Sequence, residues 1–155
     1  WQTELLSEEP NIENLNSLLD EFLKSYKKTG YTQLALLEKA NLDAKLKNYD
    51  EALYNFNELI MLTDGARDNK IFNKISRVSA SRILLSLERY DEALSMIEKY
   101  SLGDTNAPIH ELAGDILFKQ GKVNLAINQY EAAEEKYTDQ TSKSIISMKI
   151  ASISN

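Results

Sequence analysis

The chain has 155 residues, enough for one ordinary domain with a buried core, and its 24 acidic and 18 basic residues give a net charge of −6. Because these charges are interspersed, the composition argues against non-specific binding of nucleic acid and against docking on anionic lipid, both of which need a basic face. The absence of cysteine excludes disulfides and thiolate metal sites. Few glycines and prolines, five and two, favour an all-helical fold.

The first predicted helix spans residues 11–28, after a short ambiguous stretch, residues 1–9, that suggests the tail of a helix beginning upstream. Asn11 is its expected N-cap, and Gly30 is expected to end it in a left-handed conformation. Apolar residues recur along it at three- and four-residue spacing: Ile12, Leu15, Leu18, Leu19, Phe22, Leu23 and Tyr26. This stripe predicts a helix that packs on the core.

A five-residue word then occurs twice in the sequence. Tyr49–Leu53 recurs letter for letter as Tyr90–Leu94, and Val123–Ile127 is a weaker copy. Each copy is expected to lie at a tight joint between two antiparallel helices, with an N-cap at its second residue: Asp50, Asp91 and Asn124. Self-similarity at such a period indicates a solenoid of stacked helical units.

The spacing of small and large residues identifies the type of helical unit. The alanine of each copy is preceded twelve residues earlier by another small residue and followed four residues later by a bulky one. The sets are Ala40, Ala52 and Phe56; Ser81, Ala93 and Ile97; and Gly114, Ala126 and Tyr130. These offsets are those of degenerate tetratricopeptide-like repeats, in which the alanine lets the partner helix approach closely.

We therefore predict one all-α domain over residues 1–155, a tetratricopeptide-like solenoid of about three α-α hairpins. The hairpins are expected at residues 31–62, 68–100 and 108–137, followed by a last helix at 140–154. One side of this last helix is apolar, so we expect it to cover the open end of the stack through Ile146, Ile150 and Ile153. A helix that binds a partner or dimerises is the alternative.

No set of residues in the sequence assembles an active site. His110 is the only histidine, and an isolated histidine is more often a surface or cap residue than a catalyst. A second histidine for a metal pair and a cysteine nucleophile are both missing, and no serine lies in a G-x-S-x-G elbow. The glycines form no phosphate-binding loop. We therefore expect no enzymatic activity, no cofactor, no metal and no small-molecule substrate.

The first helix of each hairpin is expected to face a concave groove that binds a protein segment. Taking Ala40, Ser81 and Gly114 as equivalent, we define the groove positions as Leu37, Asn41, Ala44, Lys45, Val78, Arg82, Leu85, Ser86, Glu111, Asp115, Phe118 and Lys119. Their mixture of apolar and charged residues suits an extended or helical polypeptide. Binding of a C-terminal carboxylate is disfavoured, because Asp115 would repel it. The alternative is that the first or the last helix covers these positions.

Several segments, in this order, carry a resemblance to a known family: Gly30–Ala40, Asn48–Leu53, Ser81–Leu85, His110–Leu117, Ala126–Tyr130 and Met148–Ile150. The order resembles the soluble domain of the YfgM-type ancillary subunit of the SecYEG translocon. The resemblance covers nearly the whole chain, and its most specific part is Glu111–Leu117.

The resemblance implies a bacterial inner-membrane protein with one N-terminal transmembrane helix and a periplasmic helical domain. This domain would contact the translocon and periplasmic chaperones without catalytic residues. The chain has no run of about 18 apolar residues, the length needed to span a bilayer, and it begins at Trp1, so we expect an anchor to precede it. The alternative is a tetratricopeptide-like adaptor or regulator in another bacterial assembly, in the cytoplasm or in outer-membrane biogenesis.

Overall fold

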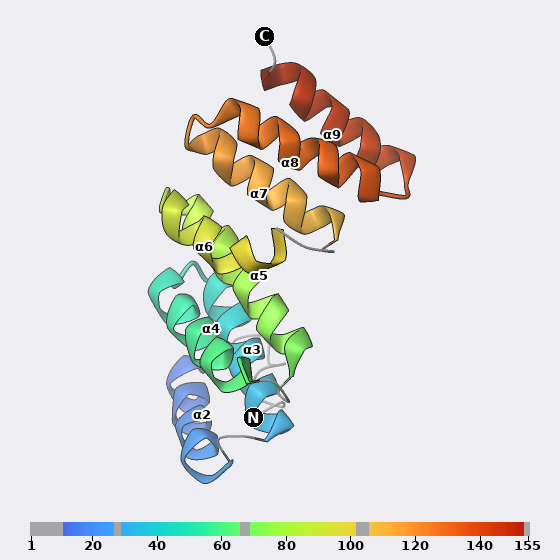
Figure 1. The fold of residues 1–155 in the computed structure, drawn as a ribbon. Helices are drawn as coiled ribbons and strands as arrows, with labels where there is room; N and C mark the ends of the chain where they lie inside the picture. The colour runs from blue at the N-terminus through green and yellow to red at the C-terminus, as the bar shows by residue number, and fades with distance from the viewer. Residues whose placement is uncertain (1–10, 27–28, 66–68, 102–105, 154–155) are drawn as a thin grey trace. The chain divides into compact units, whose positions relative to one another are not determined.

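The computed structural model describes residues 11–26, 29–65, 69–101 and 106–153. Within these ranges it contains eight α-helices and no strand, which confirms the all-α prediction. The helices, coloured from blue to red along the chain in Figure 1, are α2 (Ile12–Tyr26), α3 (Gly30–Lys45), α4 (Tyr49–Thr63), α5 (Lys70–Ser86), α6 (Tyr90–Ser101), α7 (Ala107–Lys119), α8 (Val123–Lys136) and α9 (Gln140–Ile153). The helical tail expected in residues 1–9 lies outside the described residues. Among those described, no helix has both the length and the apolar character needed to cross a membrane.

The chain divides into two compact units, Trp1–Ser79 and Ala80–Asn155, with the boundary inside α5. In the first unit, α3 packs against α4, and α2 packs against α3. The interior of this unit consists of large apolar side chains from all three helices, of which four are fully buried: Leu15, Leu36, Phe56 and Leu59. The amphipathic stripe predicted for the first helix therefore reaches the core through Leu15 and Leu19.

In the second unit, α7 packs against both α6 and α8, and α9 packs against α8. A core cluster joins α7, α8 and α9 and consists of Ala107, Leu117, Ala126, Tyr130, Ala133 and Ile146. Ile150 and Ile153 of α9 pack against this cluster and are partly buried. The apolar side of the last helix thus covers the hairpin formed by α7 and α8, as the sequence predicts (Figure 1).

The small residues of the repeats lie where helices touch at close range. The three alanines of the repeated word are all fully buried: Ala52, Ala93 and Ala126. Ser81 Oγ donates a 2.8 Å hydrogen bond to the carbonyl of Ala93, twelve residues away. A Cβ atom added to Gly114 would lie only 2.5 Å from the ring of Tyr130. The small positions picked out by the repeat pattern therefore lie in contacts between helices.

The two helices of each repeat are joined by the same three-residue turn. Its middle residue adopts a left-handed conformation, with φ of 64° at Lys47, 60° at Glu88 and 75° at Gly121. The N–H of its last residue donates to the carbonyl five residues earlier at 2.8 to 2.9 Å; these residues are Asn48, Arg89 and Lys122. The carbonyl of the same residue accepts the N–H of the repeat alanine at 2.9 to 3.0 Å. In this Schellman arrangement the N–H of the last turn residue closes the end of the first helix, and the carbonyl of the same residue accepts the first hydrogen bond of the second helix.

The joint shows that the predicted N-caps are wrong. The second helices begin two residues earlier than expected, so the predicted caps lie inside the first turn: Asp50, Asp91 and Asn124. The reason is that the residue before each helix is already fixed by the turn. Where that residue is Asn48 or Lys122, its side chain makes no capping hydrogen bond. Asp50 and Asp91 still place negative charge at the positive end of the helix dipole.

At the start of the described chain, one predicted helix boundary is confirmed and one is wrong. Asn11 Oδ1 accepts the N–H of Asn14 at 2.9 Å, as expected for the N-cap of α2. Gly30 does not end a helix; it is the first residue of α3 and is not left-handed. Thr29 provides the reason, since its Oγ1 accepts the N–H of Thr32 at 3.3 Å and caps α3.

Candidate protein-binding surface

In the first unit, the groove positions differ in how far a ligand could reach them. Leu37 of α3 is 7% exposed and therefore belongs to the core. Ala44 is half-buried, and Asn41 and Lys45 are exposed. Val78 of α5 is half-buried. A ligand on α3 would therefore meet mainly polar side chains.

The same helix carries a buried ion pair on another side. Lys39 Nζ lies 2.5 Å from Asp43 Oδ2, and each side chain is 1% exposed. Asn55 Nδ2 of α4 donates to the same carboxylate oxygen at 3.1 Å. Because all three side chains are buried, we assign them to the contact between α3 and α4 and not to a ligand site.

In the second unit, α9 engages the two acidic groove positions. Lys149 Nζ lies 2.8 Å from Glu111 Oε1 and 2.7 Å from Asp115 Oδ1. The hydroxyl of Tyr137 donates to Glu111 Oε2 at 2.6 Å, and that of Tyr130 donates to Asp115 Oδ1 at 2.8 Å. We call these five residues the Lys149 network. Within it, one ammonium group lies between two carboxylates and offsets part of their negative charge.

The pKa values in the Lys149 network follow from these contacts. Partial burial raises the pKa of Glu111, but hydrogen bonds from Lys149 and Tyr137 outweigh it and hold this pKa below the usual value. Burial lowers the pKa of Lys149, but the two carboxylates raise it above the usual value. Burial and the carboxylates of Asp115 and Glu111 raise the pKa values of Tyr130 and Tyr137. At neutral pH the lysine and Glu111 are therefore charged and both tyrosines are protonated.

The remaining groove positions of this unit are more accessible. Arg82 and Ser86 of α5 are exposed and Leu85 is half-buried. Phe118 of α7 is 40% exposed, and Lys119 next to it is exposed. The positive charge of Arg82 lowers the pKa values of Glu111 and Tyr137.

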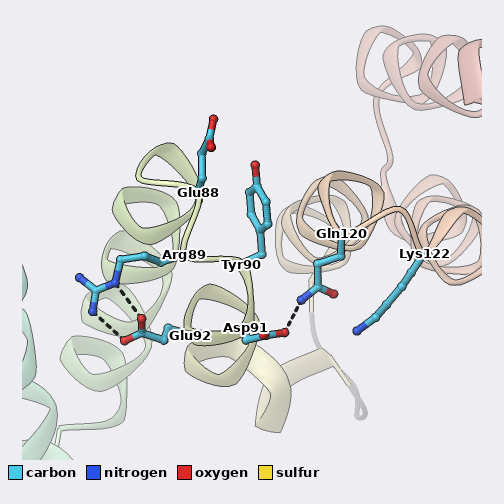
Figure 2. Close-up of a pocket in the computed structure, with 7 residues that line it drawn as sticks. All are labelled: Glu88, Arg89, Tyr90, Asp91, Glu92, Gln120 and Lys122. Atoms are coloured by element: carbon cyan, nitrogen blue, oxygen red, sulfur yellow. Dashed lines mark hydrogen bonds and ion pairs between the residues drawn. The ribbon is translucent and has the colours of Figure 1, made fainter.

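A separate pocket of about 410 Å³ lies at the joints α5–α6 and α7–α8 (Figure 2). Its lining residues are Glu88, Arg89, Tyr90, Asp91, Glu92, Gln120 and Lys122. Arg89 donates two 2.7 Å hydrogen bonds to Glu92, and Gln120 Nε2 donates to Asp91 Oδ1 at 2.7 Å. The bonds from Arg89 hold the pKa of Glu92 below its usual value. Because the lining carries both signs of charge and pairs Arg89 with Glu92, it favours no one ligand charge.

His110 is a packing residue, not the surface or cap residue expected from the sequence. It is 5% exposed, and its Nδ1 donates to Gln129 Oε1 of α8 at 2.9 Å. The reason is its position on the side of α7 that contacts α8. Among the described residues, no group of three or more histidine or carboxylate side chains is placed to hold a metal ion.

Lys149 and Tyr137 were not predicted as part of this surface, because both lie outside the helices that carry the groove positions. A signal for Lys149 was present. It lies three residues after Ile146 and next to Ile150, on the apolar side of the last helix. A lysine at such a position must find a negative partner on the neighbouring helices or remain solvated at the edge of the contact.

Comparisons with known proteins agree with this architecture. The family described as "Tetratricopeptide repeat-like domain" matches residues 2–155. The chain is 26% identical over 116 residues to a protein of Aggregatibacter actinomycetemcomitans named "Ancillary SecYEG translocon subunit". This match covers 75% of the chain and 55% of the relative, so the chain spans about half the length of that protein. Together the matches confirm the resemblance found in the sequence.

Proposed function

The chain belongs to the tetratricopeptide repeat-like domain family, and from this premise we propose that it is a non-catalytic scaffold of a bacterial translocation assembly. In this proposal it is the periplasmic domain of a membrane-anchored ancillary subunit and links the SecYEG translocon to periplasmic chaperones. The name of the relative that is 26% identical supports the link to the translocon. The family supports a role in binding other proteins.

The observation that carries the proposal is the presence of exposed side chains at equivalent positions on successive first helices. They are Asn41 and Lys45 on α3, Arg82 and Ser86 on α5, and Phe118 and Lys119 on α7. Stacked helical hairpins use this side of their first helices to bind polypeptides. Such a surface can bind a polypeptide without catalysing a reaction. The one histidine of the sequence, His110, is buried in the contact between α7 and α8.

Photo-crosslinking in membranes tests the binding role. The full-length protein carries a photoreactive amino acid at Phe118, and a matched control carries it at Leu125 of α8. Leu125 is also large and apolar and is 52% exposed, but it is not a groove position. We expect crosslinks to translocon subunits or periplasmic chaperones from Phe118 and few from Leu125. Equal capture from both, or recovery of cytosolic proteins alone, would contradict the proposal.

Cysteine labelling tests the location. Residues 1–155 contain no cysteine, so replacing the exposed Asn128 with cysteine introduces a single site for thiol labelling in this part of the protein. In intact spheroplasts that express the full-length protein with no other cysteine, we expect a membrane-impermeant maleimide to label this site. Labelling only after lysis would contradict a periplasmic location. It would favour a cytoplasmic adaptor or regulator built on the same repeats.

A further inference from the structure

The last described helix, α9, exposes no charged side chain. Its exposed residues are all serine, threonine, glutamine, alanine, isoleucine or methionine, and its two charged residues, Lys143 and Lys149, are half-buried. Each of the other described helices exposes at least one charge, from Glu13 on α2 to Glu131 on α8. Because the solvated side of a helix usually carries charged residues, the outer side of α9 is unlike that of the other helices.

Four exposed residues form a straight stripe along α9: Thr141, Ile145, Met148 and Ser152. Their spacing of four, three and four residues keeps them on one side of a helix with 3.6 residues per turn. This is the side opposite Ile146, which packs in the core cluster with α7 and α8 (Figure 1). We call the four residues the outer stripe. Its two central residues are large and apolar, and Ile145 is 48% exposed and Met148 72% exposed.

The outer stripe has the same chemical order in both directions. It reads hydroxyl, apolar, apolar, hydroxyl from Thr141 to Ser152 and also from Ser152 to Thr141. When two copies of α9 lie antiparallel with their midpoints together, Ile145 of each copy meets Met148 of the other, and Thr141 meets Ser152. A contact between identical subunits related by a twofold axis requires such self-complementarity. The spacing is also that of the seam between two helices in a coiled coil.

The charges of the chain are compatible with this pairing. Two copies that each carry a net charge of −6 repel each other through their charged surfaces, but the outer stripe carries no charge. Lys149 lies at the edge of the stripe, and its ammonium group is already bound to two carboxylates of α7. In the antiparallel pairing it lies opposite Ser144 of the second copy and not opposite a second lysine. A strongly charged partner, by contrast, would gain no ion pair from the outer stripe.

We propose that the outer stripe binds the outer stripe of a second copy of the chain, so that two copies form a symmetric dimer through antiparallel α9 helices. Ile145 and Met148 of each copy are removed from water in this contact. Because each copy contributes only two large apolar side chains, the dimer is weak, with a Kd of roughly 100 μM. The contact shares no residue with the groove positions, so it stands or fails independently of the role in translocation.

Sedimentation equilibrium of the purified chain tests the dimer. We expect the average mass to rise from that of one chain towards that of two as the concentration increases from about 10 μM to about 1 mM. Met148→Glu should weaken self-association at least about tenfold, because the contact would then bury an unpaired carboxylate from each copy. Circular dichroism melting shows whether the variant is folded.

Met61→Glu is the matched control, the same substitution at a methionine of α4 that is 66% exposed and lies outside the outer stripe. We expect it to associate as the unchanged chain does. A monomer at all concentrations would overturn the proposal. Unchanged association in Met148→Glu, or an equal loss in Met61→Glu, would overturn the assignment to α9.

Cysteine crosslinking tests the antiparallel pairing. Residues 1–155 contain no cysteine, so Thr141→Cys and Ser152→Cys each introduce a single thiol. In a mixture of the two variants we expect oxidation by copper phenanthroline to link one copy of each by a disulfide. Thr141→Cys alone should form few linked dimers, because its two thiols would lie about 16 Å apart along the paired helices. Equal linkage of Thr141→Cys to itself would indicate parallel helices and overturn the antiparallel arrangement.

Discussion

The two units each contain a lysine–carboxylate contact, and the two contacts differ mainly in burial. In the first unit, Lys39 and Asp43 are each 1% exposed. In the second, Lys149, Glu111 and Asp115 are 25 to 35% exposed. A buried charge that loses its partner has no access to water, whereas a half-exposed charge is quickly solvated. The same pair of chemical groups therefore contributes to the fold in one unit and sets the charge of a surface in the other.

The largest expected effect comes from breaking the buried pair. Lys39→Met leaves the carboxylate of Asp43 buried with only the amide of Asn55 beside it, so we expect a loss of about 3–5 kcal/mol in the free energy of unfolding. Urea denaturation followed by circular dichroism measures this loss. The control is Lys39→Met combined with Asp43→Leu, which removes both charges and should recover most of the stability. A loss below about 1 kcal/mol in the single variant would show that water reaches Asp43.

A second test concerns the helix contact in the second unit. In Gly114→Ala the new Cβ meets Cε1 and Cδ1 of Tyr130 at 2.5 and 2.6 Å. The ring cannot move freely, because it is 2% exposed and its hydroxyl is bonded to Asp115. We expect a loss of about 1–3 kcal/mol from overpacking, measured by the same denaturation. Gly30→Ala is the matched control, with nothing within 4 Å of its Cβ, and should be neutral or slightly stabilising.

The repeat contacts could be predicted from the sequence because they depend on residue size at fixed offsets along a helix. Ala52, Ala93 and Ala126 are small in the sequence and buried in the structure. The joints were harder to predict. A left-handed turn is signalled by glycine at only one of its three occurrences, Gly121, while Lys47 occupies the same conformation without that signal. Propensity alone therefore pointed to N-caps two residues too late.

The Lys149 network could not be predicted because its members come together only when three helices pack. Glu111 and Lys149 are 38 residues apart. Their sequence neighbours are mixed polar and apolar residues, as on many helix surfaces. The groove positions are defined by their spacing within one helix, and that spacing contains no information on which charges a later helix will pair. The sequence can therefore propose which positions form a surface, but not which of their charges are paired.

The half-exposed network provides the counterpart to the buried pair. In Lys149→Met the carboxylates of Glu111 and Asp115 lose their cation but remain accessible to water. We expect a loss of only about 1 kcal/mol, because solvent screens the interaction. The pKa of Glu111 should rise in this variant, and NMR titration of its side-chain carboxyl carbon measures it. A loss as large as that of Lys39→Met would mean that the two contacts do not differ as their burial suggests.

The same network predicts how stability depends on alkaline pH. The pKa values of Lys149, Tyr130 and Tyr137 are raised in the folded state. Their contribution is therefore fully present below the unfolded values of about 10 and is lost as pH rises through the folded values. We expect the melting temperature to fall as pH rises above about 10. Tyr137→Phe should make this fall shallower, and an identical pH profile in that variant would exclude Tyr137 as a cause.

The smallest expected effects compare the joints. Lys47 in the first unit and Glu88 in the second hold φ near 60°, a conformation that costs an L-residue about 1 kcal/mol and costs glycine little. Lys47→Gly and Glu88→Gly should each therefore raise the free energy of unfolding, by about 0.5–1 kcal/mol. Gly121→Ala should lower it by a similar amount, since nothing lies within 4 Å of the added Cβ and only the backbone conformation opposes it. If Lys47→Gly destabilises the chain, the stem of Lys47 must contribute packing that outweighs the backbone strain.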